Sequence, residues 1–136
     1  MKEFFLKDLE AVATYILQTA DTKTLLFFGD MGVGKTTLIK ELTKQLGSQD
    51  QSSSPTFSLV NEYQNVHGQI VYHFDFYRIN HEEEALDIGL DEYLYSDAWC
   101  FIEWPERISS LLDTQVTNVN ISIDLDSQAR TIEVIK

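Results

Sequence analysis

A nine-residue segment, GDMGVGKTT at 29–37, constrains the fold more than any other part of the chain. It contains the pattern G-x-x-x-x-G-K-T, in which Gly29, Gly34, Lys35 and Thr36 occupy the fixed positions. The apolar run TLLFF precedes it, and leucine and isoleucine recur at helical spacing after it. A buried strand, a glycine-rich loop and a helix in this order predict a phosphate-binding loop.

The remainder of the chain alternates between helical and extended patterns. Apolar residues recur every three or four positions in some segments, and short apolar or alternating runs fill others. These patterns predict helices at 8–19, 35–46, 82–86 and 90–94, and strands at 24–28, 59–63, 70–75, 98–102, 119–123 and 131–135. The polar segment SQDQSSS at 48–54 has no period, and we expect it to form a mobile loop.

Turn residues connect several of these strands into pairs. The strands at 59–63 and 70–75 are predicted to form one hairpin, and those at 119–123 and 131–135 a C-terminal antiparallel hairpin. Because helices alternate with both buried and half-buried strands, we predict an α/β fold of the P-loop NTPase type, with a mixed β-sheet flanked by helices. A length of 136 residues fits one domain, so residues 1–136 are predicted to form a single P-loop domain.

The phosphate loop has the chemistry to bind a nucleoside triphosphate. Glycines let the backbone N–H groups point at phosphate oxygens, and the start of the helix adds a favourable dipole. Lys35 is predicted to bind the β- and γ-phosphates, the Thr36 hydroxyl to bind magnesium, and Thr37 to contact the α-phosphate. The predicted nucleotide ligands in this loop are Gly29, Gly32, Val33, Gly34, Lys35, Thr36 and Thr37.

Magnesium at such a site also needs a carboxylate, which binds the ion directly or through water. Two candidates follow apolar strands: Asp75 comes after VYHF, and Glu103 comes after WCFI. An acid at the carboxyl edge of a sheet points into the ligand crevice, although either residue can instead be a surface charge at a strand end. The residues alone leave the choice between the two open.

Further residues are candidates at the edge of the site. Proline restricts the preceding Ser54, and the Thr56 hydroxyl can sense a γ-phosphate as switch segments do, although both residues also suit a plain turn. Trp104 directly follows Glu103, so it can line the nucleotide site, mark a partner surface or cover the sheet edge. His73 has no second His or Cys beside it, which favours a core or crevice histidine over a metal ligand.

The net charge of the chain and the length of its apolar runs limit the possible partners. Ten Lys and Arg residues against 22 Asp and Glu residues give a formal net charge of −12. Such a surface repels phosphate, so we expect no direct nucleic-acid binding. Apolar runs fall far short of the roughly 20 residues that span a membrane, and acidic residues interrupt the N-terminus. We therefore expect a soluble cytoplasmic protein with no membrane partner, and its single cysteine, Cys100, excludes an internal disulfide.

Missing motifs narrow the class of nucleotide protein. The sequence has neither the N-K-x-D and D-x-x-G strings of GTPases nor the Ser-Gly-Gly signature of transporter ATPases. Small-molecule kinases usually carry a lid with several arginines, whereas Arg78, Arg107 and Arg130 are scattered here. A minimal ATPase that hydrolyses ATP slowly and acts on a partner fits best. A small kinase and a nucleotide-gated binding module without essential turnover remain as alternatives.

Four blocks after the phosphate loop resemble the signature blocks of the TsaE family: SPTFSLVNEY at 54–63, HFDFYR at 73–78, ALDIGLDEYL at 85–94 and FIEWPERI at 101–108. This resemblance implies an ATPase required for N6-threonylcarbamoyladenosine at position 37 of tRNAs that read ANN codons. The implied cofactors are ATP and Mg²⁺. The implied partners are the TsaB and TsaD proteins, whose complex the ATPase resets between turnovers and which stimulate its weak hydrolysis.

The resemblance also implies roles for individual residues. Thr36 and Glu103 resemble the magnesium ligands of the family. Asp75 resembles its second essential acid, which orients the attacking water or holds magnesium-bound waters. The implied catalytic residues are therefore Lys35, Thr56, Asp75 and Glu103.

Three more residues match positions around the nucleotide of the family, and one departs from its pattern. Ser54, together with Thr56, resembles the switch segment. Trp104 resembles the family tryptophan beside the site, and Arg130 lies where some members approach the adenine. Phe76 replaces the commoner leucine of the H-x-D-L-Y-R block, which is a conservative apolar change.

Overall fold

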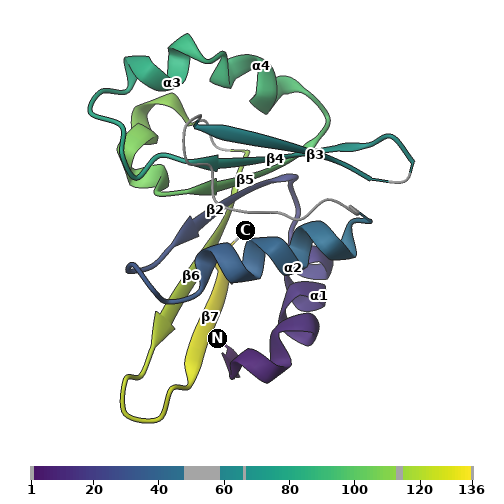
Figure 1. Ribbon diagram of the computed structural model, residues 1–136, viewed down its shortest axis with the longest axis vertical. Helices are drawn as coiled ribbons and strands as arrows, with labels where there is room; N and C mark the ends of the chain where they lie inside the picture. The colour runs from purple at the N-terminus through teal and green to yellow at the C-terminus, as the bar shows by residue number, and fades with distance from the viewer. Residues whose placement is uncertain (1, 48–58, 66, 113–114, 136) are drawn as a thin grey trace.

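A computed structural model describes residues 2–47, 59–65, 67–112 and 115–135. Its centre is a seven-stranded mixed β-sheet with the strand order β1-β7-β6-β2-β5-β4-β3 (Figure 1). The strands are β1 (Lys2–Phe4), β2 (Thr24–Phe28), β3 (Val60–Gln64), β4 (Ile70–Asp75), β5 (Trp99–Glu103), β6 (Thr117–Ile123) and β7 (Arg130–Ile135). The α-helices are α1 (Leu9–Thr19), α2 (Lys35–Gln45), α3 (Glu83–Asp87) and α4 (Leu90–Tyr95), and the 3-10 helices are η1 (Leu6–Asp8) and η2 (Pro105–Leu111).

The middle of the sheet is parallel, and its edges are antiparallel. β2 pairs in parallel with β5 on one side and with β6 on the other, and β4 pairs in parallel with β5. β3, β7 and β1 each add to the sheet in antiparallel pairings. The central strands β2 and β5 are nearly continuous apolar runs because both of their faces are covered.

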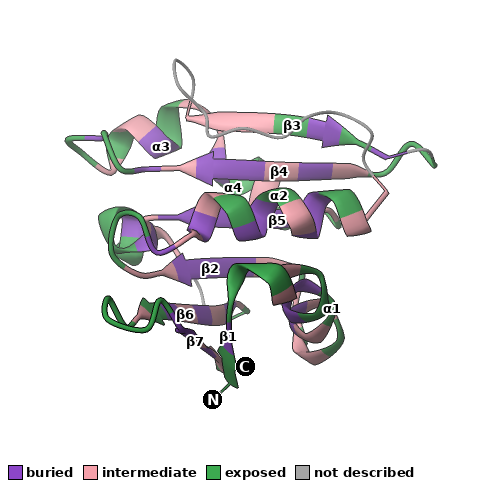
Figure 2. Ribbon diagram, turned by 60° about the horizontal axis from the view of Figure 1, so that its bottom comes forward, coloured by how far each residue is buried: buried purple, intermediate pink, exposed green. Residues whose placement is uncertain are grey.

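An apolar core lies on each face of the sheet and holds the layers together. On one face, α1 and α2 pack against alternate strand residues such as Leu25, Phe27 and Phe101. On the other face, α3, α4 and η2 pack against Leu26 and Ile102. Figure 2 shows the central strands mostly buried, and buried residues alternating with exposed ones along α2. The fold is therefore α/β, with helices on both faces of a mixed sheet.

The fold class and both predicted hairpins are confirmed, with local differences. The predicted strand at 98–102 is Trp99–Glu103, so Glu103 belongs to the strand and does not follow it. The predicted helix at 8–19 starts as the 3-10 helix η1 before α1 begins at Leu9. The segment predicted to be a mobile loop, 48–54, lies outside the described residues. None of the described helices is long and apolar enough to cross a membrane.

The topology brings the ends of three strands to one edge of the sheet. The parallel strands β2, β4 and β5 run in the same direction, so the loop after β2 lies beside the last residues of β4 and β5. Asp75 and Glu103 are direct neighbours in the β4–β5 register, and Phe27 pairs with Glu103 in the β2–β5 register. Ligand crevices of open α/β sheets lie at this edge.

Candidate functional site

The phosphate loop packs directly on a neighbouring strand, and this contact requires its first glycine. A Cβ atom at Gly29 would lie 2.6 Å from the backbone oxygen of Ile121 in β6 and 2.9 Å from a methyl carbon of Val33. Gly34 has a left-handed φ of 104° and precedes the first residue of α2. The turn therefore depends on both glycines. It leads into the first residues of α2, which line the cavity and whose backbone N–H groups lack acceptors within the helix.

Lys35 is enclosed at the bottom of this loop, with 5% of its surface exposed. Its Nζ donates a hydrogen bond of 2.6 Å to the Gly29 carbonyl and lies 3.7 Å from the ring centroid of Trp104. Removal from water lowers the pKa of Lys35, and surrounding carboxylates oppose this shift. These carboxylates are Glu103, Glu106, Asp75 and Asp30. The carboxylates favour the charged form of Lys35 at the place where a triphosphate would need a cation.

Trp104 covers Lys35 from a constrained backbone conformation. Its φ of 57° and ψ of 50° place it in the left-handed region, which costs a non-glycine residue about 1 to 2 kcal/mol. The Trp104 carbonyl accepts a hydrogen bond from Arg107 N, and the Trp104 ring lies 5.0 Å from the ring of Tyr77. This turn directs the indole over the ammonium group and forms an aromatic wall of the cavity.

Glu103 connects the end of β5 to the start of α2. Its Oε1 accepts a 2.9 Å hydrogen bond from the Thr36 hydroxyl, and its Oε2 lies 2.6 Å from His73 Nε2. Two oxygens bound to Mg²⁺ at about 2.1 Å in adjacent octahedral positions lie about 2.9 Å apart. The pair formed by Thr36 and Glu103 therefore has the donor type and the spacing of two magnesium ligands.

Asp75 lies next to Glu103 but in different surroundings. Its Oδ1 accepts a 3.0 Å hydrogen bond from the Tyr77 backbone N–H. Desolvation raises the pKa of Asp75, and the nearby Glu103 adds to this shift, whereas the Tyr77 N–H, His73 and Lys35 oppose it. The carboxyl group of Asp75 therefore holds a proton more readily than an exposed aspartate does.

Arg130, the first residue of β7, fastens the phosphate loop from the other side. It is largely buried, and its Nε donates a 2.8 Å hydrogen bond to the Val33 carbonyl. A Cβ atom at Gly34 would lie 3.5 Å from the same nitrogen. Arg130 thus helps to fix the conformation of the loop, a contact that the sequence did not reveal.

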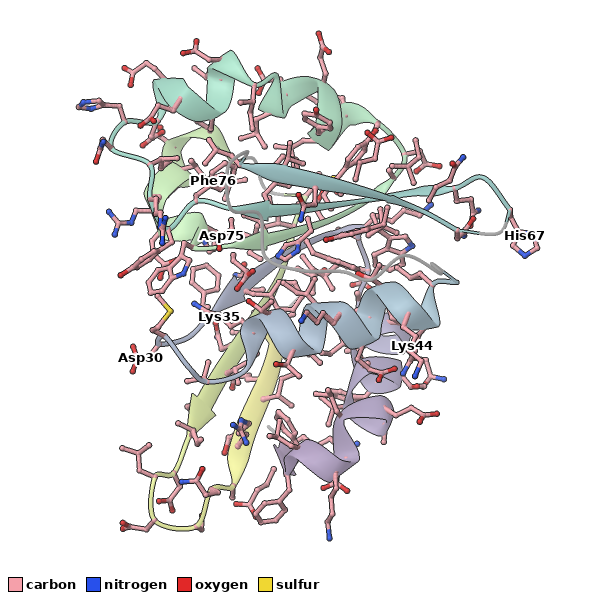
Figure 3. All side chains as sticks on the ribbon, in the orientation of Figure 1. Asp30, Lys35, Lys44, His67, Asp75 and Phe76 are labelled. Atoms are coloured by element: carbon pink, nitrogen blue, oxygen red, sulfur yellow. The ribbon has the colours of Figure 1, made fainter. Side chains whose placement is uncertain are left out.

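A cavity of about 300 Å³ brings most of the predicted residues together. Its lining includes Gly32, Gly34, Lys35, Thr36, Thr37, Asp75, Glu103, Trp104 and Arg130. Figure 3 shows Lys35 and Asp75 at the same end of the molecule as Asp30, whereas Lys44 and His67 lie at the opposite end. The spatial arrangement therefore brings the phosphate loop together with the carboxylates that end β4 and β5.

Comparisons with known proteins identify the family of the chain. A family model described as "Threonylcarbamoyl adenosine biosynthesis protein TsaE" matches residues 6–132. The chain belongs to the TsaE family. A relative named tRNA threonylcarbamoyladenosine biosynthesis protein TsaE, from Haemophilus influenzae, is 37% identical over 125 residues, which cover 90% of this chain and 77% of the relative. A protein of the same name from Rickettsia bellii is 40% identical over 111 residues, which cover 81% of this chain and 75% of that one.

A solved structure supports the same relationship at the level of the fold. A crystal structure of Bacillus subtilis YdiB superimposes with a TM-score of 0.72 at 27% sequence identity. The match covers 96% of this chain and 80% of that chain. The α/β architecture described above is therefore shared with an experimentally determined structure.

Some of the predicted site residues lie apart from the main cavity, and some residues that line the cavity were not predicted. Gly29 and Val33 do not line the main cavity but line an adjoining hollow on the β6 side of the loop. Ser54 and Thr56, the predicted switch residues, lie outside the described part of the chain. Tyr77 lines the main cavity, and the HFDFYR block that contains it was the available signal.

Leu6 and Met31 also line the cavity, and His73 contacts Glu103. No sequence pattern pointed to Leu6 or Met31, because their position depends on how η1 and the loop tip meet. His73 was expected to be a core or crevice histidine, and it is buried beside the cavity.

Proposed function

We propose that this chain is an ATPase that binds ATP and Mg²⁺ in the cavity between the phosphate loop and the ends of β4 and β5. The observation that carries the proposal is the contact of Thr36 with Glu103, two oxygen ligands at magnesium spacing, beside the Lys35 ammonium. Across the described ranges, no three His, Cys, Asp or Glu side chains form a group that could hold a metal. This suits Mg²⁺, which is usually held by one or two carboxylates together with phosphates and water.

Lys35 would change partners when the nucleotide binds. Its ammonium donates to a neutral carbonyl and lies over an indole ring. Charged phosphate oxygens accept stronger hydrogen bonds than a carbonyl does, so we infer that Lys35 turns from Gly29 toward the phosphates. Gly32, Gly34, Thr36 and Thr37 would supply further donors from the loop and the start of α2. Bound magnesium would neutralise the charge that develops on the transferred phosphoryl group.

Asp75 is the second acid in this proposal. Its raised pKa suits a group that orients the attacking water and accepts its proton. It lines the same cavity as Glu103, so holding magnesium-bound waters is the other role that its position allows. Both roles leave Thr36 and Glu103 as the direct magnesium ligands.

We propose further that the nucleotide cycle acts on a complex of TsaB and TsaD during formation of N6-threonylcarbamoyladenosine at position 37 of ANN-reading tRNAs. The names of the relatives support the pathway. The acidity of the chain supports a protein partner over direct tRNA binding: segment 79–106, which contains α3 and α4, has no Lys or Arg. Such a surface suits a basic face of TsaD, where the chain would compete with tRNA. The cytoplasm is the compartment that this role implies.

The test is a tRNA modification assay with purified TsaB and TsaD, with and without this chain. The assay also contains TsaC, the separate enzyme of this pathway that makes the threonylcarbamoyl-adenylate donor. We expect many turnovers with the wild-type chain and loss of turnover with Lys35→Ala. Lys44→Ala is the matched control, because Lys44 is an exposed lysine in the last turn of the same helix. Multiple turnovers without this chain would overturn the proposed role.

A second variant separates ATP hydrolysis from nucleotide-gated binding. Glu103→Ala removes a proposed magnesium ligand while leaving the phosphate loop in place. If hydrolysis drives the cycle, this variant should no longer form ADP from ATP, and it should also lose multiple-turnover modification. Retention of full modification by Glu103→Ala would favour a binding module that needs no turnover.

A further inference from the structure

His73 is a buried polar residue that the proposed reaction does not use. It lies in β4 with 1% of its surface exposed. Its strand neighbour in β5 is Phe101, two residues before Glu103, so His73 and Glu103 are diagonal neighbours on the face that carries α2. Their side chains meet at 2.6 Å between Nε2 and Oε2. A carboxylate oxygen accepts, so the imidazole donates its Nε2–H.

The opposite ring nitrogen distinguishes this histidine from a residue that serves packing alone. His73 Nδ1 is buried and has no hydrogen-bond partner within the part of the chain that the structure describes. Buried polar atoms are nearly always paired, and an orphaned one calls for an explanation. An apolar side chain would fill this place without leaving an unpaired atom. Among the described residues, the imidazole ring therefore makes its side-chain hydrogen bond to Glu103 alone.

The two contacts of Glu103 have different fates when a metal binds. The Thr36 hydroxyl donates a hydrogen bond to Oε1 of Glu103. The Thr36 hydroxyl oxygen and Oε1 are the two proposed magnesium ligands, so each would turn to the ion and this hydrogen bond would be lost. The bond from His73 to Oε2 involves the oxygen on the far side of the carboxylate and can persist. Partners of this kind fix the orientation of a ligating group and tune its affinity.

We propose that His73 is a positioning residue, whose Nε2–H holds Oε2 of Glu103 so that Oε1 faces the magnesium that accompanies the nucleotide. This inference rests on the proposed function, since it requires Glu103 to bind magnesium. His73 itself touches neither the nucleotide nor the ion. It acts by restricting rotation of the carboxylate, so its effect belongs to the metal-dependent part of nucleotide binding.

The experiment measures the affinity of the whole chain for ADP by calorimetry, once with Mg²⁺ and once with EDTA. The ratio of the two affinities is the magnesium increment, and it requires no catalysis. His73→Leu and His73→Asn remove the donor at the Nε2 position, because the asparagine amide is too short to reach it. His73→Gln restores an amide N–H at nearly the distance of Nε2. We expect the first two variants to lose about tenfold or more of the increment and His73→Gln to retain most of it.

Matched controls separate positioning from packing. Val71→Ala alters a buried residue two positions earlier on the same face of β4, so it should lower stability but leave the magnesium increment intact. The affinity for ADP in EDTA should stay the same in all His73 variants. In a Glu103→Gln background, His73→Asn should have no further effect. Thermal unfolding of each variant checks that it is folded, and the pair His73→Gln and His73→Asn tests the idea even if His73→Leu does not fold.

The outcomes distinguish this inference from the function on which it rests. A wild-type chain without any magnesium increment would overturn both. A normal wild-type increment that His73→Asn leaves unchanged would overturn the positioning role alone. Equal losses in His73→Gln and His73→Asn, or a loss that persists in the Glu103→Gln background, would also overturn it, because the effect would then not pass through this hydrogen bond.

Discussion

At the scale of single residues, two neighbouring carboxylates lie in different surroundings. Glu103 is held by side chains on both oxygens, Thr36 on one and His73 on the other. Asp75 accepts a backbone N–H from Tyr77, and burial raises its pKa. Pairs of acids whose surroundings differ in this way commonly divide catalytic work between them. The register of β4 and β5 is what places the two side by side.

The raised pKa of Asp75 predicts that replacing this residue by asparagine increases stability but lowers activity. A carboxyl group whose pKa is higher in the folded state favours folding most at low pH, and this contribution is lost as pH rises through the folded pKa. Asp75→Asn removes the half-buried charge and keeps an oxygen that can accept the Tyr77 N–H. We therefore expect it to raise the free energy of unfolding near neutral pH, with a gain that shrinks toward zero below the ordinary aspartate range.

Urea unfolding of both proteins at several pH values measures this difference. Hydrolysis should fall in the same variant, because the second acid is gone. Asp87→Asn is the control, since that aspartate is exposed at the end of α3. A variant that is less stable than wild type at neutral pH would show that burial does not disfavour the Asp75 charge.

At the scale of elements, the unit of β2, phosphate loop and α2 depends on one close backbone approach. A Cβ at Gly29 would meet the Ile121 backbone oxygen at 2.6 Å, and a strand backbone in the middle of a sheet cannot easily move. Gly29→Ala should therefore lower the free energy of unfolding by about 1 to 3 kcal/mol and weaken nucleotide binding. Thermal unfolding and ADP calorimetry measure the two effects.

Gly32→Ala is the matched comparison within the same loop. A Cβ there would meet no atom within 4 Å, although its φ of 85° is unfavourable for alanine. Its stability loss should be that of backbone strain, about 1 to 2 kcal/mol at most, without a clash against β6. If Gly32→Ala disturbed folding more than Gly29→Ala, the packing of the loop on β6 would not be the feature that requires Gly29.

The same elements show how far the sequence could predict the structure. The strand, loop and helix from 24 to 45 are specified by local apolar runs and glycines, so their type and order were predictable. β1 spans three residues and η2 has no apolar period, so both were missed, since each forms through contacts with distant segments. The His73 contact with Glu103 depends on β5 lying beside β4, which no local pattern records.

In the candidate site, too, the residues of a local motif were predictable, whereas contacts between distant segments were not. Lys35 and Thr36 were identified by a motif with a fixed spacing, whereas Asp75 and Glu103 could be named as candidates but not separated by the residues alone. Their contacts differ in the structure, because Glu103 and not Asp75 accepts the Thr36 hydroxyl. Arg130 was placed near the nucleotide by resemblance alone. Its bond to the Val33 carbonyl depends on β7 starting beside the loop, which no local pattern records.

At the scale of the whole molecule, β5 links the site to the core. Glu103 faces the cavity at the end of the strand, and Cys100 lies three residues earlier in the core under α3 and α4. Movement of this strand would therefore disturb both regions. The chain has one cysteine, so its thiol reports on the opening of this layer without interference.

Labelling of Cys100 should therefore depend on nucleotide binding. Burial raises the pKa of its thiol to about 12, so little reactive thiolate is present while the chain is folded. We expect iodoacetamide at pH 8 to modify the folded chain far more slowly than the chain in urea, through rare openings that expose β5. Since such openings also break the Thr36 and Glu103 contact, ADP with Mg²⁺ at about 100 times its dissociation constant should slow labelling about 100-fold.

Mass spectrometry of the alkylated protein measures the rates. Lys35→Ala, with the same nucleotide concentration, should show little slowing, and rapid labelling of the folded wild type or labelling insensitive to nucleotide would contradict the coupling of core and site through β5.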